Sequence, residues 1–108
     1  MRLIEKIAQK YDGMGVRSMV VPEWEETIYY KPLTGEEWET VIREIGGDAT
    51  GPRSNAQVIV LKALDSNGVR LFKNDDASIL MEKGFIETTR RVAAAMTTIT
   101  SIEDAGKN

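Results

Sequence analysis

The chain has 108 residues, 42% of them apolar and 29% charged, and its formal net charge is −3. This length and composition predict one soluble globular domain and exclude a disordered tail. Because the sequence contains no Cys and no His, disulfides and Cys-bound zinc are excluded, and the commonest general base near neutral pH is missing. We therefore expect a protein without a catalytic site, a bound metal or a cofactor.

Neither nucleic acid nor a membrane is an expected partner. Phosphate binding draws on clustered Lys and Arg side chains, and the nearest cluster here is Arg90 and Arg91, which we interpret as part of a solvated helix face. Glu5 and Lys6 interrupt the apolar residues near the N-terminus, and no window approaches the roughly 18 uninterrupted apolar residues of a membrane span. We expect an intracellular, soluble protein.

The first predicted element is an N-terminal helix. Apolar residues recur at the spacing of one helical face, at Leu3, Ile4, Ile7 and Ala8. Asp12-Gly13 should end this helix, because glycine commonly follows the last helical residue.

A β-hairpin is predicted next. Segments 17–21 and 26–31 are rich in β-branched and aromatic residues, and a proline-containing turn separates them. In the second strand Ile28 and Tyr30 should share one face, with Tyr29 on the other.

Trp24, at the expected tip of the hairpin, has two interpretations. An aromatic side chain that projects from a loop can anchor a partner protein. Its large apolar surface can equally fold back over the hairpin and close a small core, which we favour. Trp24 and Tyr29 nevertheless stay candidates for partner binding.

A second helix should begin at Thr34, because Thr34-Gly35-Glu36-Glu37 fits the capping box. Glu36 and Glu37 would then lie in the first turn, where negative charge favours the positive end of the helix dipole. This accounts for these carboxylates better than catalysis or metal binding does.

The middle of the chain contains a predicted surface loop at 47–54, which is rich in Gly, Pro and small polar residues and should be mobile. The apolar spacing in 56–64 matches a helix, although its apolar run would equally suit a buried strand. We favour the helix because of the Ala, Leu and Lys content.

A turn at 65–68 and a helix start at 74–76 should lead into a helix at 77–83. The Asp and Asn oxygens in these turns lack the alternation and the terminal Glu of a calcium loop, so we predict no metal site. A hydrolase that uses Asp75 or Asp76 with Lys73 is disfavoured, because neither a phosphate loop nor a nucleophile elbow is present.

The last predicted helix runs from Phe85 to about Ser101, with an apolar stripe formed by Phe85, Val92, Met96 and Ile99. We expect Thr88, Thr89 and Arg90 to face away from this stripe. The small residues before Met96 permit close packing of another helix, either from this chain, which we favour, or from a second copy. Met96 nevertheless stays a further candidate for partner binding. A frayed polar tail is expected from residue 103.

Together these elements predict an α+β protein in which an N-terminal helix, a β-hairpin and about four further helices form one small, mainly helical domain over residues 1–108. The order of four motifs along the chain is similar to that of a known protein family. The hairpin at 20–24, the Leu33–Glu37 helix start, Leu71-Phe72 ahead of Asp75-Asp76 and the tail at 103–108 resemble the tail assembly chaperones of long-tailed, siphophage-type bacteriophages. The N-terminal helix is not part of that pattern.

The resemblance implies a non-catalytic factor that binds the tape measure protein and promotes assembly of the tail tube. It implies the host cytoplasm as the location and absence from the mature virion. The partners would be the tape measure protein, the tail tube protein and a longer frameshifted form of the chain. A homo-oligomer is a further expected partnership, from the packing surface of the last helix. The alternative is a small homo-oligomeric regulatory or adaptor module, which the same amphipathic helices would support.

Overall fold

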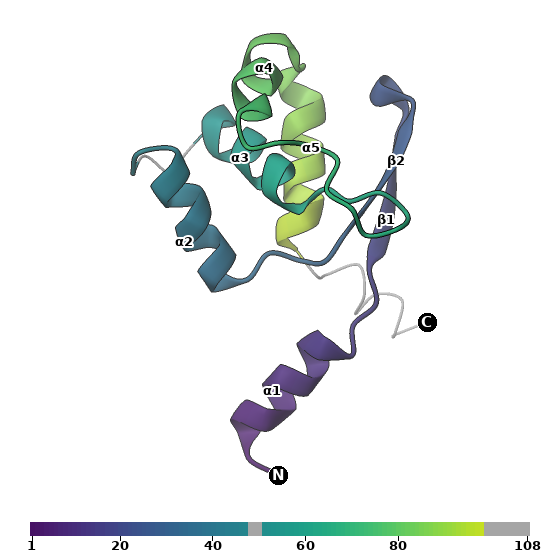
Figure 1. Cartoon of the computed structure of the whole chain (residues 1–108), viewed down its shortest axis with the longest axis vertical. Helices are drawn as coiled ribbons and strands as arrows, with labels where there is room; N and C mark the ends of the chain where they lie inside the picture. Colours follow the sequence, from purple (N-terminus) through teal and green to yellow (C-terminus); the bar gives the residue numbers. More distant parts are fainter. Residues whose placement is uncertain (48–50, 99–108) are drawn as a thin grey trace.

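In the computed structural model, which describes residues 1–47 and 51–98, a two-stranded antiparallel hairpin lies at one side of a group of helices (Figure 1). The elements in chain order are α1 (Leu3–Asp12), β1 (Arg17–Val21), the short 3₁₀ turn η1 (Pro22–Trp24), β2 (Glu26–Tyr30), α2 (Gly35–Glu44), α3 (Pro52–Lys62), α4 (Asp76–Lys83) and α5 (Ile86–Thr97). The predicted α+β class and the order of its elements are confirmed.

The hairpin follows the predicted alternation. Met19 pairs with Ile28 and Ser18 with Tyr29. The side chains of Ile28 and Tyr30 are buried, whereas Tyr29 is half-buried on the other face. Leu64, beyond the end of α3, exchanges backbone hydrogen bonds with Tyr29 at 2.8 and 2.9 Å, so the chain adds a short third partner to the hairpin edge.

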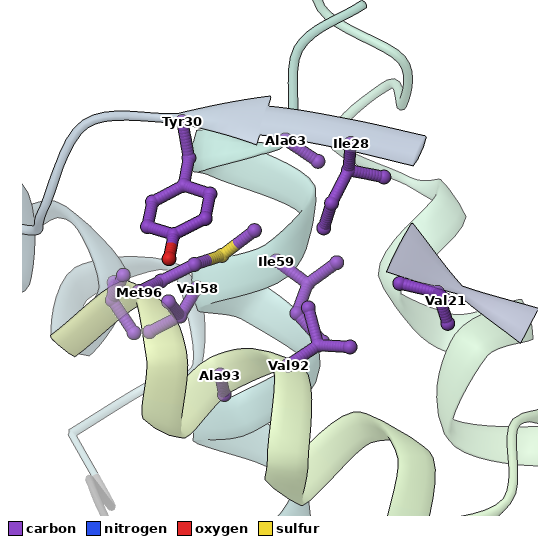
Figure 2. Close-up of a cluster of buried hydrophobic side chains, with 10 residues drawn as sticks. Val21, Ile28, Tyr30, Val58, Ile59, Ala63, Val92, Ala93 and Met96 are labelled. Atoms are coloured by element: carbon purple, nitrogen blue, oxygen red, sulfur yellow. The ribbon is translucent and has the colours of Figure 1, made fainter. Parts of the chain in front are cut away.

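The core lies between the hairpin, α3 and α5, and their buried side chains converge in Figure 2. The buried apolar residues of this core are Val21, Ile28, Tyr30, Val41, Val58, Ile59, Ala63, Val92, Ala93 and Met96. Since α3 is covered by neighbours around most of its surface, it carries buried residues on nearly every face. That coverage explains why an apolar run at 58–61 resembled a buried strand although it is helical.

The predicted capping box at the start of α2 is confirmed. The Thr34 hydroxyl accepts from the backbone N–H of Glu37 at 3.2 Å, and the Glu37 carboxylate accepts from the N–H of Thr34 at 2.9 Å. Both carboxylate oxygens of Glu37 also accept from Nζ of Lys62 at 2.8 Å. One side chain therefore caps α2 and joins it to the last turn of α3.

The predicted loop at 47–54 is too long. Helix α3 already begins at Pro52, because proline has a backbone angle suited to the first turn and lacks an N–H that would go unpaired there. Residues 48–50 of the predicted loop lie outside the described residues. The helical interpretation of 56–64 is confirmed up to Lys62, and Ala63 is extended.

The outward orientation predicted for Thr88 and Thr89 is wrong, since both are buried. Thr88 donates to a carboxylate oxygen of Glu23 at 3.0 Å, and Thr89 donates to the carbonyl of Ile86 at 3.2 Å, so both hydroxyls are satisfied inside the protein. Phe85 does not belong to the apolar stripe: it precedes the helix in an extended conformation and is 73% exposed.

Helix α5 ends at Thr97, earlier than predicted, because Thr98 is extended. Ile99, Ser101 and the tail from 103 lie outside the described residues.

Helix α1 extends away from the rest of the chain (Figure 1), and none of its residues is buried. Its last turn meets the end of β2 through Lys31, whose ammonium donates to the carbonyl of Tyr11 at 3.2 Å and lies 4.5 Å from the centre of the Tyr11 ring. The apolar face predicted for this helix therefore points into solvent.

Candidate protein-binding site

An apolar cleft lies where the tip of the hairpin, the segment before α4 and α4 itself meet. It has a volume of about 310 Å³ and is lined by Trp24, Glu26, Ile28, Leu71, Phe72 and Leu80. A hollow of about 420 Å³ shares four of these residues and adds Asp76, Ile79, Lys83 and Gly84. We call this combined surface the Trp24 cleft.

Trp24 and Phe72 form the centre of the cleft. Their ring centres lie 6.3 Å apart and the rings are inclined by 75°, an edge-to-face arrangement that aromatic pairs favour. Both side chains pack against the core while remaining partly exposed. The interpretation in which Trp24 folds back over the hairpin is confirmed, and the indole still forms part of an accessible wall.

The segment that carries Leu71 and Phe72 is fixed by polar contacts. The Arg70 guanidinium donates to the carbonyl of Val60 at 2.6 Å and to Oδ1 of Asn74 at 2.9 Å. The N–H of Leu71 donates to the carbonyl of Ala63 at 3.0 Å. Arg70 thus satisfies a carbonyl in the last turn of α3, where carbonyls lack helical partners, and holds Leu71 and Phe72 over the hairpin.

The hairpin tip is tied to α5 beside Trp24. Arg91 donates to both carboxylate oxygens of Glu23 at 2.7 and 2.9 Å, and Thr88 adds a hydrogen bond at 3.0 Å. The hydrogen bond from Arg91 is the main reason why the pKa of Glu23 falls from 4.5 to about 2. Of the pair expected on a solvated helix face, Arg90 is exposed and Arg91 makes this contact.

Gly84 ends α4 at the edge of the cleft. A methyl group placed on Gly84 would lie 2.5 Å from the carbonyl oxygen of Leu80 and 3.3 Å from a side-chain carbon of Thr89. The absence of a side chain at Gly84 therefore avoids a collision with the last turn of α4, which carries Leu80.

The three candidate partner-binding residues are not brought together. Trp24 lines the cleft. Tyr29 is half-buried on the hairpin face opposite Ile28, outside the residues that line the cleft. Met96 has 0% exposure and lies in the core, so its side chain is not accessible to a partner; the face predicted for it packs against this chain's own α3 and hairpin instead (Figure 2).

Sequence reasoning missed the apolar residues that give the cleft its accessible surface. Leu71 is 36% exposed and Ile79 is 54% exposed. Leu71 entered only through the motif order of the resemblance, and Ile79 only as part of the predicted helix at 77–83. Their exposure follows from contacts across the fold, and local spacing carries little signal for it.

A second hollow, of about 340 Å³, is polar and lies between the end of α2, the first half of α3 and the start of α4. Its polar lining residues are Glu44, Arg53, Gln57, Asn74, Asp75 and Ser78. Over residues 1–47 and 51–98, no three acidic side chains gather closely enough to hold a metal ion. The Trp24 cleft differs from this hollow in its largely apolar lining.

Comparison with protein-family models, with curated proteins and with solved structures gave no match. In the part of the chain that the structure describes, no helix is long and apolar enough to cross a bilayer. The chemistry of the site is that of an apolar surface with a few charged groups at its edge, which suits contact with another polypeptide.

Proposed function

We propose that this protein is a non-catalytic tail assembly chaperone of a long-tailed bacteriophage, which binds a helix of the tape measure protein in the Trp24 cleft. It would thereby keep its client soluble and promote assembly of the tail tube protein around it. It would act in the host cytoplasm and be absent from the mature virion. The resemblance in motif order supports the choice of client, and the cleft supports the mode of binding.

The observation that carries this proposal is an accessible apolar cleft whose walls are joined to the fold by hydrogen bonds from Arg70 and Arg91. Trp24, Phe72 and Leu80 pack on the core from below, while Leu71 and Ile79 offer accessible apolar surface. An amphipathic client helix places its anchors at intervals of three or four residues and fits a groove of this kind. A preformed groove also lowers the entropic cost of binding.

A homo-oligomeric regulatory or adaptor module is the second candidate. The exposed apolar face of α1 favours it, because Leu3, Ile4 and Ile7 are each more than half exposed. Such a face on a soluble domain commonly marks an interaction surface.

Co-expression with the tape measure protein of the same phage tests the first candidate. We expect the tagged chain to retain the tape measure protein and to raise its soluble fraction. The cleft variants Leu71→Glu and Ile79→Glu should lower retention at least tenfold, because a carboxylate would be buried under the client. Val69→Glu is the matched control, since Val69 is exposed in the same segment but does not line the cleft.

Retention by wild-type chain and by the control, with loss in both cleft variants, supports the proposal. No retention by the wild-type chain would contradict the chaperone function. Equal retention by all variants would contradict the cleft as the client site.

A further inference from the structure

We infer that helix α1 of a second copy of this chain docks in the Trp24 cleft. This inference rests on the second candidate function above, the homo-oligomer, and names its contact. It does not require a client. A client helix in the same cleft would have to displace α1, so failure of self-association and failure of client retention are separate results. The proposed contact links two accessible apolar surfaces that the single chain leaves uncovered.

Helix α1 needs an apolar partner. Leu3, Ile4 and Ile7 are 69%, 56% and 54% exposed, and they lie on one face of a helix of ten residues. Helices of this length are only marginally stable in water when isolated. A groove that covers this face would therefore stabilise the helix as well as the contact.

The same chain does not place α1 near its own cleft. Lys31 holds the last turn of α1 at the end of β2, whereas Trp24 lies at the opposite end of that strand. In Figure 1, α1 points away from α4 and from the tip of the hairpin. While the Lys31 contact persists, a second copy must supply the helix.

The sizes of the two surfaces agree. Ten helical residues span about 15 Å, and the cleft extends along α4, which has eight residues and so spans about 12 Å. Leu3 and Ile7 are one helical turn apart, as are Ile79 and Lys83 at the rim of the cleft.

The charges on α1 and on the rim of the cleft are complementary. Lys6 and Lys10 follow one edge of the apolar face of α1, and Arg2 extends that edge at the N-cap. The charged residues that line the cleft are Glu26, Asp76 and Lys83, an excess of acid. The basic edge of α1 would be attracted to Glu26 and Asp76 of the second copy. The acidic residues of α1 would then face solvent.

Exchange in both directions would produce a closed pair. Each copy would insert its α1 into the cleft of the other, which is an isologous contact with twofold symmetry. The second insertion is then intramolecular within the pair, so it adds stability at a small entropic cost.

Complementation between two full-length variants tests the inference. The helix variant carries Ile4→Glu and Ile7→Glu, and the cleft variant carries Leu71→Glu and Ile79→Glu. We expect wild-type chain to self-associate in sedimentation equilibrium and each variant to be monomeric alone. An equimolar mixture should form a one-to-one pair, since one intact helix and one intact cleft remain. Circular dichroism confirms that each variant is folded.

Four outcomes would overturn the inference: a monomeric wild-type chain at every concentration, a mixture that stays monomeric, self-association of the helix variant, or self-association of the cleft variant. Pairing of α1 with α1 would leave the cleft variant associated, and docking in the chain's own cleft would leave the wild-type chain monomeric. The experiment therefore distinguishes both alternative contacts from the proposed one.

Charge reversal provides a second measurement that leaves the apolar groups intact. Lys6→Glu with Lys10→Glu should weaken association, and adding Glu26→Lys should restore part of it. Equal weakening with and without Glu26→Lys would contradict the proposed orientation. The control Glu36→Lys changes an exposed acid on α2 and should have no effect.

Discussion

Lys62 and Glu37 form an ion pair that joins α3 to α2, with Nζ of Lys62 lying 2.8 Å from both carboxylate oxygens of Glu37. The Lys62 side chain is 8% exposed and that of Glu37 is 30% exposed. The same carboxylate caps α2 through Thr34. Two helices therefore depend on one side chain.

The two partners should respond differently to substitution. Glu37→Gln leaves a buried ammonium without its charge partner, and we expect a loss of about 2 kcal/mol, because the pair is partly solvated. Lys62→Met replaces the buried charge with an apolar chain of similar length and should change stability by less than about 1 kcal/mol. Urea denaturation at neutral pH measures both. A larger loss in Lys62→Met than in Glu37→Gln would contradict this account.

Glu23 and Arg91 predict a pH dependence. The pKa of Glu23 is lowered from 4.5 to about 2, chiefly by the hydrogen bond from Arg91, so the folded state favours the charged carboxylate. Its contribution is complete above about 4.5 and is lost as the pH falls through about 2. In Arg91→Gln, an NMR titration should show this pKa returning toward 4.5. An unchanged titration would show that Arg91 is not the cause.

Gly84→Ala should destabilise the chain by roughly 1–3 kcal/mol, because the new methyl group would collide with the carbonyl of Leu80. Gly15→Ala is the control, since no atom lies within 4 Å of the added methyl group. Thermal unfolding of the two variants measures the difference. Equal melting temperatures would contradict the close contact between Gly84 and the carbonyl of Leu80.

Substitutions in the core and in the cleft should have different effects on stability and on client binding. Met96→Ala removes a fully buried side chain and should cost about 2–5 kcal/mol of stability, while a folded Met96→Ala chain keeps its affinity for a client. Ile79→Ala should change stability by less than about 1 kcal/mol and weaken client binding, because Ile79 is exposed at the rim of the cleft. Loss of client binding in Met96→Ala, with stability unchanged, would contradict the assignment of Met96 to the core.

Elements with strong local signals were predictable from the sequence. The capping box fixed the start of α2, and the alternation of Ile28 and Tyr30 fixed the inward face of the hairpin. Both signals are local, because a cap satisfies N–H groups within one turn and strand faces alternate with each residue.

Features that depend on distant contacts were not predictable. Thr88 is buried because Glu23, 65 residues away, accepts its hydrogen bond. Lys62 is buried because Glu37, 25 residues away, neutralises it. The Trp24 cleft arises in the same way, from the meeting of Trp24 with Phe72. Polarity and helical spacing give no signal for such pairings, and the burial of Met96 also depended on which elements covered α5.

The central claim is that the Trp24 cleft binds a helix of another polypeptide. The most direct test is an NMR titration of the isotopically labelled chain with a helical segment of the tape measure protein. We predict that the largest amide shifts will occur at Leu71, Phe72, Ile79 and Leu80, with a change in the indole N–H of Trp24. Shifts confined to α2 or to the polar hollow, or no shifts at saturating peptide, would contradict the claim.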